Sequence, residues 1–161
     1  MSIVTGSVLA WSPYVETVEE LEREDVLALI FIESTGNPNA VRGDTYFGLL
    51  QISDAYMQDA LDFAGRDFMP ARALVGDGIM SIRIFRWYMQ RYESVHEWDP
   101  VMAALLHKMG PAGLKRVISN MTMGMNIYEA VEADSTPGAL EYLIRFENAR
   151  EAYREREGFS G

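Results

Sequence analysis

Apolar residues recur at intervals of three and four along most of this chain, which is the spacing of an amphipathic helix. Strict alternation of apolar and polar positions, which indicates a strand, is nearly absent. The spacing predicts helices over residues 16–34, 52–65, 78–92, 101–108, 112–119 and 140–156. We therefore expect a mainly α fold of about six to eight helices, with at most a small antiparallel hairpin in the loop before Gly48.

Residues that favour helix ends support several of these bounds. Asp99 is a candidate N-cap, and Pro100 suits the first helical position because its missing N–H needs no partner there. Gly36 and Pro38 end the helix predicted over residues 16–34. Residues 119–138 show the least regular pattern, and we assign no helix or strand to them.

Composition limits the classes of protein to which this chain can belong. Its 161 residues, 48% of them hydrophobic, fit one domain, which we place at residues 16–161 after an N-terminal extension over residues 1–15. With no cysteine and only two histidines, we expect no disulfide, no metal site and no cofactor. A net charge of -10 argues against nucleic-acid binding through bulk electrostatics.

The beginning of the chain bears on its localisation. It lacks the basic start and long apolar core of a secretory signal peptide. No stretch approaches the roughly 20 apolar residues that a membrane-spanning helix needs. We therefore expect no membrane span and, if the protein acts outside a cytoplasm, delivery by another route.

Glu33 is a carboxylate on a face that should be apolar. Ile30, Leu29 and Val26 precede it by three, four and seven positions, which places them on its side of the predicted helix. An ionised carboxylate is costly to bury, so a residue that continues this stripe is protonated, paired or used in chemistry. Glu33 is therefore the first candidate for a functional residue.

Three short motifs follow one another around Glu33. They are Glu33-Ser34, then Asn37-Pro38-Asn39-Ala40-Val41, then Gly48-Leu49-Leu50-Gln51-Ile52. In order and spacing they resemble the catalytic domain of the lysozyme-like soluble lytic transglycosylases, relatives of goose-type lysozyme, which carry Glu-Ser, Asn-Pro-x-Ala-Val and Gly-Leu-Met-Gln-Ile. The resemblance spans residues of roughly 20 to 150 and implies a lysozyme-like fold.

The second half of the chain resembles that family more loosely. Where the family has Ala-Tyr-Asn-x-Gly-Pro, this chain has His107 and Lys108 before Gly110-Pro111. His107 would contact a stem-peptide carboxylate, or it faces solvent. Tyr142 keeps its spacing from Pro137 in the family's Pro-Glu-Thr-x-x-Tyr-Val element. It would hold the catalytic carboxylate in place by a hydrogen bond, or it is an aromatic residue of the core.

The resemblance implies a reaction on peptidoglycan. One Glu protonates the glycosidic oxygen between N-acetylmuramic acid and N-acetylglucosamine, and then takes a proton from the C6 hydroxyl, which closes a 1,6-anhydro ring. A carboxyl group can act as this acid near neutral pH when an apolar setting raises its pKa, and Glu33 directly follows Phe31 and Ile32. We therefore predict a lytic transglycosylase in which Glu33 is the catalytic residue.

Residues near Glu33 would bind the substrate, although each has a simpler structural alternative. Ser34 would contact the carboxylate or the sugar, or it only ends the helix. Gln51 would pair with an N-acetyl group, or its amide braces the loop. Gly48 would let the backbone approach the sugar closely, or it is an ordinary turn glycine. Tyr46, from its position in the loop, is the best candidate for a sugar-stacking ring.

Two alternative functions compete with the transglycosylase. Asp44 lies in the same loop, and if it positions a water molecule the protein is a goose-type-like muramidase; otherwise Asp44 is a solvated turn residue. The loose later motifs favour a non-catalytic wall-binding or structural module. Because an acidic chain is not drawn to an anionic wall, we expect delivery to the bacterial wall or periplasm by a bacteriophage or phage-like particle, with tail or other virion proteins as partners.

Overall fold

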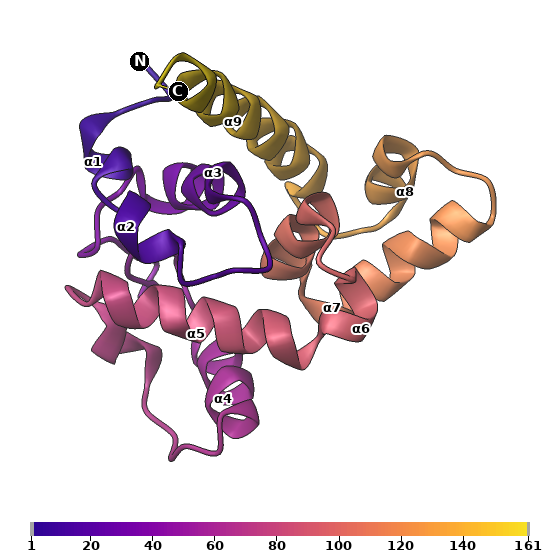
Figure 1. Ribbon diagram of the computed structural model, residues 1–161. Coiled ribbons are helices and arrows are strands. Elements are labelled where there is room, and N and C mark those ends of the chain that lie inside the picture. Colours follow the sequence, from indigo (N-terminus) through magenta and orange to yellow (C-terminus); the bar gives the residue numbers. More distant parts are fainter. Residues whose placement is uncertain (1, 161) are drawn as a thin grey trace. The chain divides into compact units, whose positions relative to one another are not determined.

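The computed structural model describes residues 2–160, and their fold is mainly α, as predicted (Figure 1). The helices are α1 (Gly6–Leu9), α2 (Ser12–Val15), α3 (Arg23–Ser34), α4 (Asp54–Phe63), the 3-10 helix η1 (Ala71–Leu74), α5 (Gly78–Arg91), α6 (Glu93–His96), α7 (Pro100–Thr122), α8 (Ile127–Ala133) and α9 (Ala139–Ser160). The strands β1 (Val41–Arg42) and β2 (Tyr46–Phe47) form the small antiparallel hairpin that we predicted. These elements are consistent with a lysozyme-like α fold.

Contacts within the chain divide the described residues into two compact units. The first unit contains the residues up to Arg91 and those from Ala149 onward, and the second is Tyr92–Asn148. The boundary that we predicted after residue 15 lies inside the first unit, where α1 and α2 contact α3. Val8 and Val15, one from each of these short helices, are almost completely buried.

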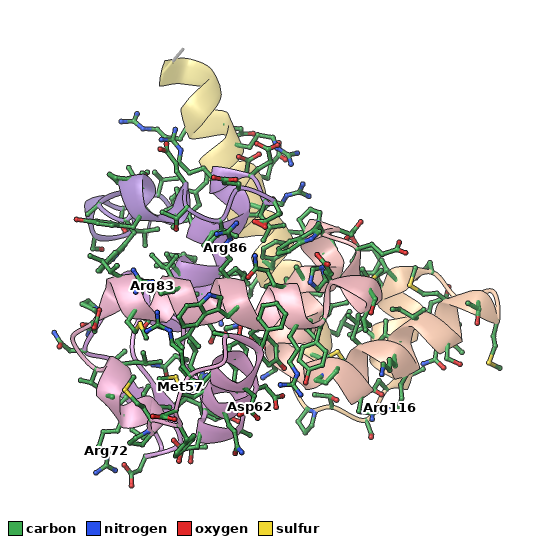
Figure 2. The ribbon with its side chains drawn as sticks, turned by 60° about the horizontal axis from the view of Figure 1, so that its bottom comes forward. Met57, Asp62, Arg72, Arg83, Arg86 and Arg116 are labelled. Carbon is green, nitrogen blue, oxygen red and sulfur yellow. The ribbon has the colours of Figure 1, made fainter. Side chains whose placement is uncertain are left out.

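The start of α3 differs from the sequence prediction. The helix begins at Arg23 rather than at residue 16, because Glu22 and Asp25 form a capping box in which each side chain accepts the other residue's backbone N–H. Residues 16–22 form turns instead, and Glu20 in this segment pairs with Arg86 of α5 at 3.2 Å (Figure 2). The predicted end at Ser34 is confirmed, because Thr35 follows in the left-handed conformation with φ 52°.

Asp25 also joins α3 to the last part of α9 within the first unit. Its carboxylate lies 2.6 Å from the Arg150 guanidinium, and the neighbouring Glu24 pairs with Arg154 at 3.4 Å. Burial raises the pKa of Asp25 and outweighs the opposite effect of Arg150. The helix that carries Glu33 is thus anchored at its first turn, away from the candidate site.

The second unit confirms some helix bounds and adds two helices that we did not predict, α6 and α8. Asp99 caps α7 through the backbone N–H of Met102, and Pro100 takes the first helical position, as predicted. The helix is interrupted at Gly110, with φ 77° and ψ 173°, so the predicted helices over 101–108 and 112–119 flank a kink. We did not predict α8, although Asn126 and Glu129 form a capping box at its start.

No helix in the described part of the chain is long and apolar enough to cross a membrane.

Candidate functional site

Glu33 occupies the last turn of a helix that is buried along nearly all its length. The helix residues from Glu24 to Ile30 and Ile32 are buried, and only 7% of the Glu33 side chain is exposed. The carboxylate is therefore largely withdrawn from water, as the apolar pattern around it predicted. Polar or charged neighbours must offset the hydration that a carboxylate loses in this position.

One such neighbour is Arg42 of the hairpin, which the sequence analysis did not identify. Its Nη2 atom lies 3.6 Å from Oε1 of Glu33. The guanidinium also stacks over the ring of Tyr46, 5.3 Å from the ring centroid. Because Arg42 and Tyr46 are paired across the two strands, the hairpin brings a cation and an exposed aromatic ring to the catalytic candidate.

A second neighbour is Tyr56 of α4, which stacks against Tyr88 of α5. Burial raises the pKa of Tyr56 well above its ordinary value, and the neighbouring Tyr88 and the negative charge of Glu33 add to the increase. The Tyr56 phenol therefore stays protonated throughout the neutral range. It supplies a neutral polar group to the surroundings of Glu33 without adding a second negative charge.

Ser34 joins the end of α3 to the turn that follows the hairpin. Its hydroxyl donates to the carbonyl oxygen of Leu49 at 2.6 Å and more weakly to that of Ile30 at 3.3 Å. These bonds fix the position of Gly48–Ile52 relative to Glu33. Ser34 thus braces this turn as well as ending α3, and its contact with substrate stays a prediction.

Gln51 braces the same turn from the inside. Its Nε2 donates to the carbonyl oxygens of Ala40 at 3.1 Å and Gly48 at 2.9 Å, and the residue is only 6% exposed. Both amide hydrogens are therefore used within the loop. What Gln51 can still offer an N-acetyl group is its amide oxygen, as an acceptor.

Gly48 is required by the fold of the turn itself. Its φ of +80° lies in the region that favours glycine, and a Cβ would lie 3.0 Å from the carbonyl oxygen of Leu74 and 3.2 Å from Oγ of Ser81. The close approach observed here is to η1 and α5. Close approach to a sugar stays a prediction.

Asp44 lies at the tip of the hairpin and pairs with Arg72 of η1, which projects outward in Figure 2. The two groups are 2.6 Å apart, with 77% and 69% of their side chains exposed. Asp44 is thus an exposed turn residue in an ion pair. The Arg72 guanidinium also lies over the ring of Phe47, so Arg42 and Arg72 stack on consecutive aromatic residues of β2.

The structure brings Glu33, Ser34, Tyr46, Gly48 and Gln51 together in the first unit. The other two predicted site residues belong to the second unit. His107 is half-buried on α7, and Tyr142 is 8% exposed on α9, with Nζ of Lys108 5.7 Å from its ring centroid. The roles of His107 and Tyr142 toward Glu33 stay predictions.

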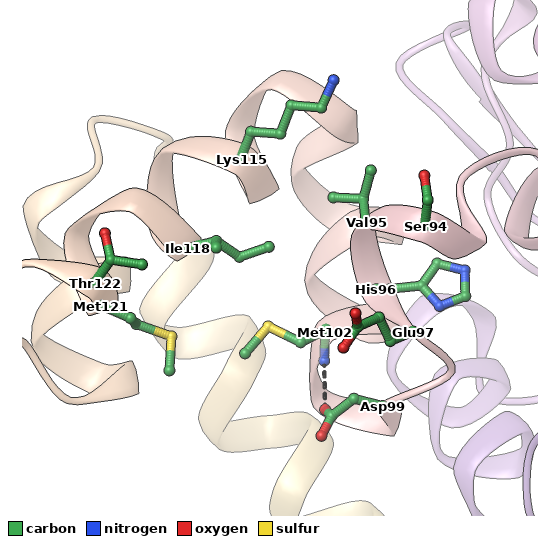
Figure 3. Close-up of a pocket in the computed structure, with 10 residues that line it drawn as sticks. All are labelled: Ser94, Val95, His96, Glu97, Asp99, Met102, Lys115, Ile118, Met121 and Thr122. Atoms are coloured by element: carbon green, nitrogen blue, oxygen red, sulfur yellow. Dashed lines mark hydrogen bonds between the residues drawn. The ribbon is translucent and has the colours of Figure 1, made fainter.

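The second unit contains a pocket of about 780 Å³ that includes none of the predicted site residues. It lies between α6 and α7, and Figure 3 shows Met102 and Met121 directed toward one another across it. His96 on its wall is buried, and its Nδ1 accepts the backbone N–H of Trp98 at 2.8 Å. No motif in the sequence pointed to this pocket.

Among the described residues, no group of three or more His, Asp or Glu side chains is arranged to hold a metal ion. No model of a known protein family matches the chain, and no curated protein sequence is significantly similar to it. A proposal about function therefore rests on the residues and their geometry.

Proposed function

We propose that this protein is a peptidoglycan lytic transglycosylase in which Glu33 acts first as an acid and then as a base. The observation that carries the proposal is the setting of Glu33. It is a covered carboxylate at the end of a buried helix, beside a hairpin that presents Arg42 and the exposed ring of Tyr46. Such a carboxylate, next to an aromatic surface, suits acid–base chemistry on a sugar.

The proposed reaction needs one proton carrier and no water. Glu33 gives its proton to the bridging oxygen as the bond between that oxygen and C1 of N-acetylmuramic acid breaks. The C6 hydroxyl oxygen of the same sugar bonds to C1, and its proton goes to the Glu33 carboxylate. The products are a free hydroxyl on the leaving sugar and a 1,6-anhydro ring, and Glu33 is ready for another cycle.

The state of Asp44 favours this reaction over hydrolysis. An inverting hydrolase needs a second carboxylate to activate water. Asp44, the residue that we considered for this role, is held by Arg72 at 2.6 Å on an exposed turn. A transglycosylase requires no such residue, so the contacts of Asp44 support the single-carboxylate mechanism.

The substrate in this proposal is the glycan strand of the bacterial wall. The chain carries a net charge of -10 and gains no general attraction to an anionic polymer. We therefore propose that a bacteriophage or phage-like particle delivers it, with tail or other virion proteins as partners. Purified particles that lack the protein, together with export by the cell's own secretion machinery, would contradict this delivery route.

The reaction is tested by digesting purified peptidoglycan and weighing the released muropeptides by mass spectrometry. The wild type should release anhydro products, each lighter by one water than a reducing-end product, and Glu33→Gln should release none. The matched control is Glu132→Gln, which changes an exposed carboxylate of α8 and should leave the products unaltered.

Other outcomes separate the alternative functions. Reducing-end products would show a hydrolase and make Asp44 the next residue to change. No product from a folded wild-type protein that still sediments with peptidoglycan would show a wall-binding module.

A further inference from the structure

An exposed cation of the hairpin, Arg42, faces the covered carboxylate of Glu33. The Arg42 side chain is 62% exposed, whereas that of Glu33 is 7% exposed, and their charged atoms are 3.6 Å apart. Ion pairs between two exposed side chains contribute little because water screens them. Here one partner is largely shielded from water, so the cation has a greater effect on the carboxylate.

The hairpin holds Arg42 in place from several directions. Its backbone is paired with Tyr46, and its guanidinium lies over the Tyr46 ring. Two residues before Arg42, the carbonyl oxygen of Ala40 accepts hydrogen bonds from the Gly48 backbone N–H, at 2.8 Å, and from the Gln51 amide. The strand is thus fixed to the turn beside Glu33, and the side chain extends from it into solvent.

The charge of Glu33 changes during the reaction proposed above. Glu33 begins neutral, becomes a carboxylate when it gives up its proton, and is neutral again after it takes the proton of the C6 hydroxyl. A guanidinium holds its own proton and takes no part in the transfer. It can, however, stabilise the carboxylate stage, as positively charged groups do where negative charge develops.

We propose that Arg42 is a positioning residue that stabilises the ionised form of Glu33 and so sets the pH range in which Glu33 can act as an acid. This inference rests on the proposed function. The groups that act on Glu33 include Arg42 from β1 and the protonated phenol of Tyr56 from α4. Arg42 carries a positive charge, so its removal should favour the protonated form of Glu33 over the ionised form.

The direction of the effect follows from the order of the steps. Glu33 must start protonated, and Arg42 favours loss of that proton. Without Arg42, Glu33 stays protonated to higher pH, and the ionised Glu33 that forms during the reaction is less stable. In Arg42→Gln the alkaline limb of the kcat/KM profile should therefore move to higher pH. The maximal rate should fall roughly tenfold.

Two further variants make the test specific. Arg42→Lys keeps a positive charge at this position and should return the alkaline limb toward that of the wild type. Arg72 is the other exposed arginine that stacks on the hairpin, but it pairs with Asp44 and not with Glu33. Arg72→Gln should therefore leave the alkaline limb of the pH profile unmoved. A purely structural role for Arg42 would lower the rate at every pH without moving the limb, and that result would overturn the inference.

An NMR titration separates this inference from the proposed function. The carboxyl carbon signal of Glu33 can be followed against pH in the wild type and in Arg42→Gln without any turnover. If the protein cleaves no peptidoglycan but the signal titrates at higher pH in the variant, the function fails and the coupling of Arg42 to Glu33 stands. If the two titrations coincide, the inference is wrong even for an active enzyme.

Discussion

The ring of Tyr56 lies almost flat against the ring of Tyr88, with the centroids 3.5 Å apart and the planes inclined by 11°. Tyr56 belongs to α4 and Tyr88 to α5, two helices that pack against each other in the first unit. Both residues are buried, and the charge of Glu33 acts on Tyr56. The stack therefore holds a protonated phenol at a fixed place near the catalytic candidate.

The Tyr56 hydroxyl should contribute to the position of Glu33 more than to the stability of the fold. Tyr56→Phe keeps the stacked ring and removes only the hydroxyl. We expect kcat on peptidoglycan to fall on the order of tenfold, because a small displacement of a catalytic group is costly in rate. Steady-state kinetics and thermal unfolding measure the two effects separately. A loss of stability without a change in kcat would show that the hydroxyl matters only for packing.

A side chain at position 48 should destabilise the fold for two separable reasons. Gly48→Ala combines a φ of +80° with a Cβ placed 3.0 Å from the Leu74 carbonyl oxygen. We expect it to lower the free energy of unfolding by about 2 to 3 kcal/mol. Gly43→Ala is the matched control, because its φ is +61° and nothing lies within 4 Å of its Cβ. That variant should cost only about 1 kcal/mol.

Urea unfolding of both glycine variants measures this difference. Equal losses would mean that backbone conformation alone requires the glycine at position 48. A larger loss for Gly48→Ala would show that the turn must pack closely on η1.

Local patterns predicted the end of α3 and the burial of Glu33, because both depend on residues within two helical turns. The start of α3 was missed, because apolar spacing continued past the Glu22–Asp25 capping box that sets the first turn. The contact of Arg42 with Glu33 could not be predicted, since it depends on the register of a hairpin of which the sequence showed only a weak sign. The Tyr56–Tyr88 stack likewise depends on how two helices pack.

Asp134 gives the second unit a stability that should decrease in acid. Its side chain is 2% exposed, and hydrogen bonds from Arg116 and Thr136 lower its pKa to about 2. The ordinary value of an Asp is about 3.9, so the ionised form is stabilised by folding. The stabilisation of the fold by ionised Asp134 is therefore fully present above about pH 4 and is lost as the pH falls toward 2.

Asp134→Asn should therefore unfold at lower urea concentration than the wild type at neutral pH. The two midpoints should approach each other as the pH falls from about 4 toward 2, where the wild-type carboxyl also becomes neutral. Urea unfolding at several pH values, followed by circular dichroism, measures the gap. A gap that stays constant over this range would mean that the ion pair with Arg116 does not stabilise the fold.

Trp11 should be part of the structure that supports Glu33, although we predicted residues 1–15 as an extension. Its ring occupies the space where a Cβ of Gly78 would lie, and its indole N–H donates to the Gly36 carbonyl oxygen at 3.1 Å. Gly36 comes directly after the left-handed cap of α3. Trp11→Ala should thus lower the free energy of unfolding by about 2 to 3 kcal/mol and free the end of the helix that carries Glu33.

Thermal unfolding and peptidoglycan cleavage test the two parts of this expectation. The variant should lose about 5 to 10 °C in Tm, given the size of the chain, and should lose activity at temperatures where it is still folded. The matched control is Phe68→Ala, an aromatic residue of the first unit that is 54% exposed and should change neither value. If Trp11→Ala lowered Tm but left activity intact, the N-terminal helices would stabilise the first unit without positioning its carboxylate.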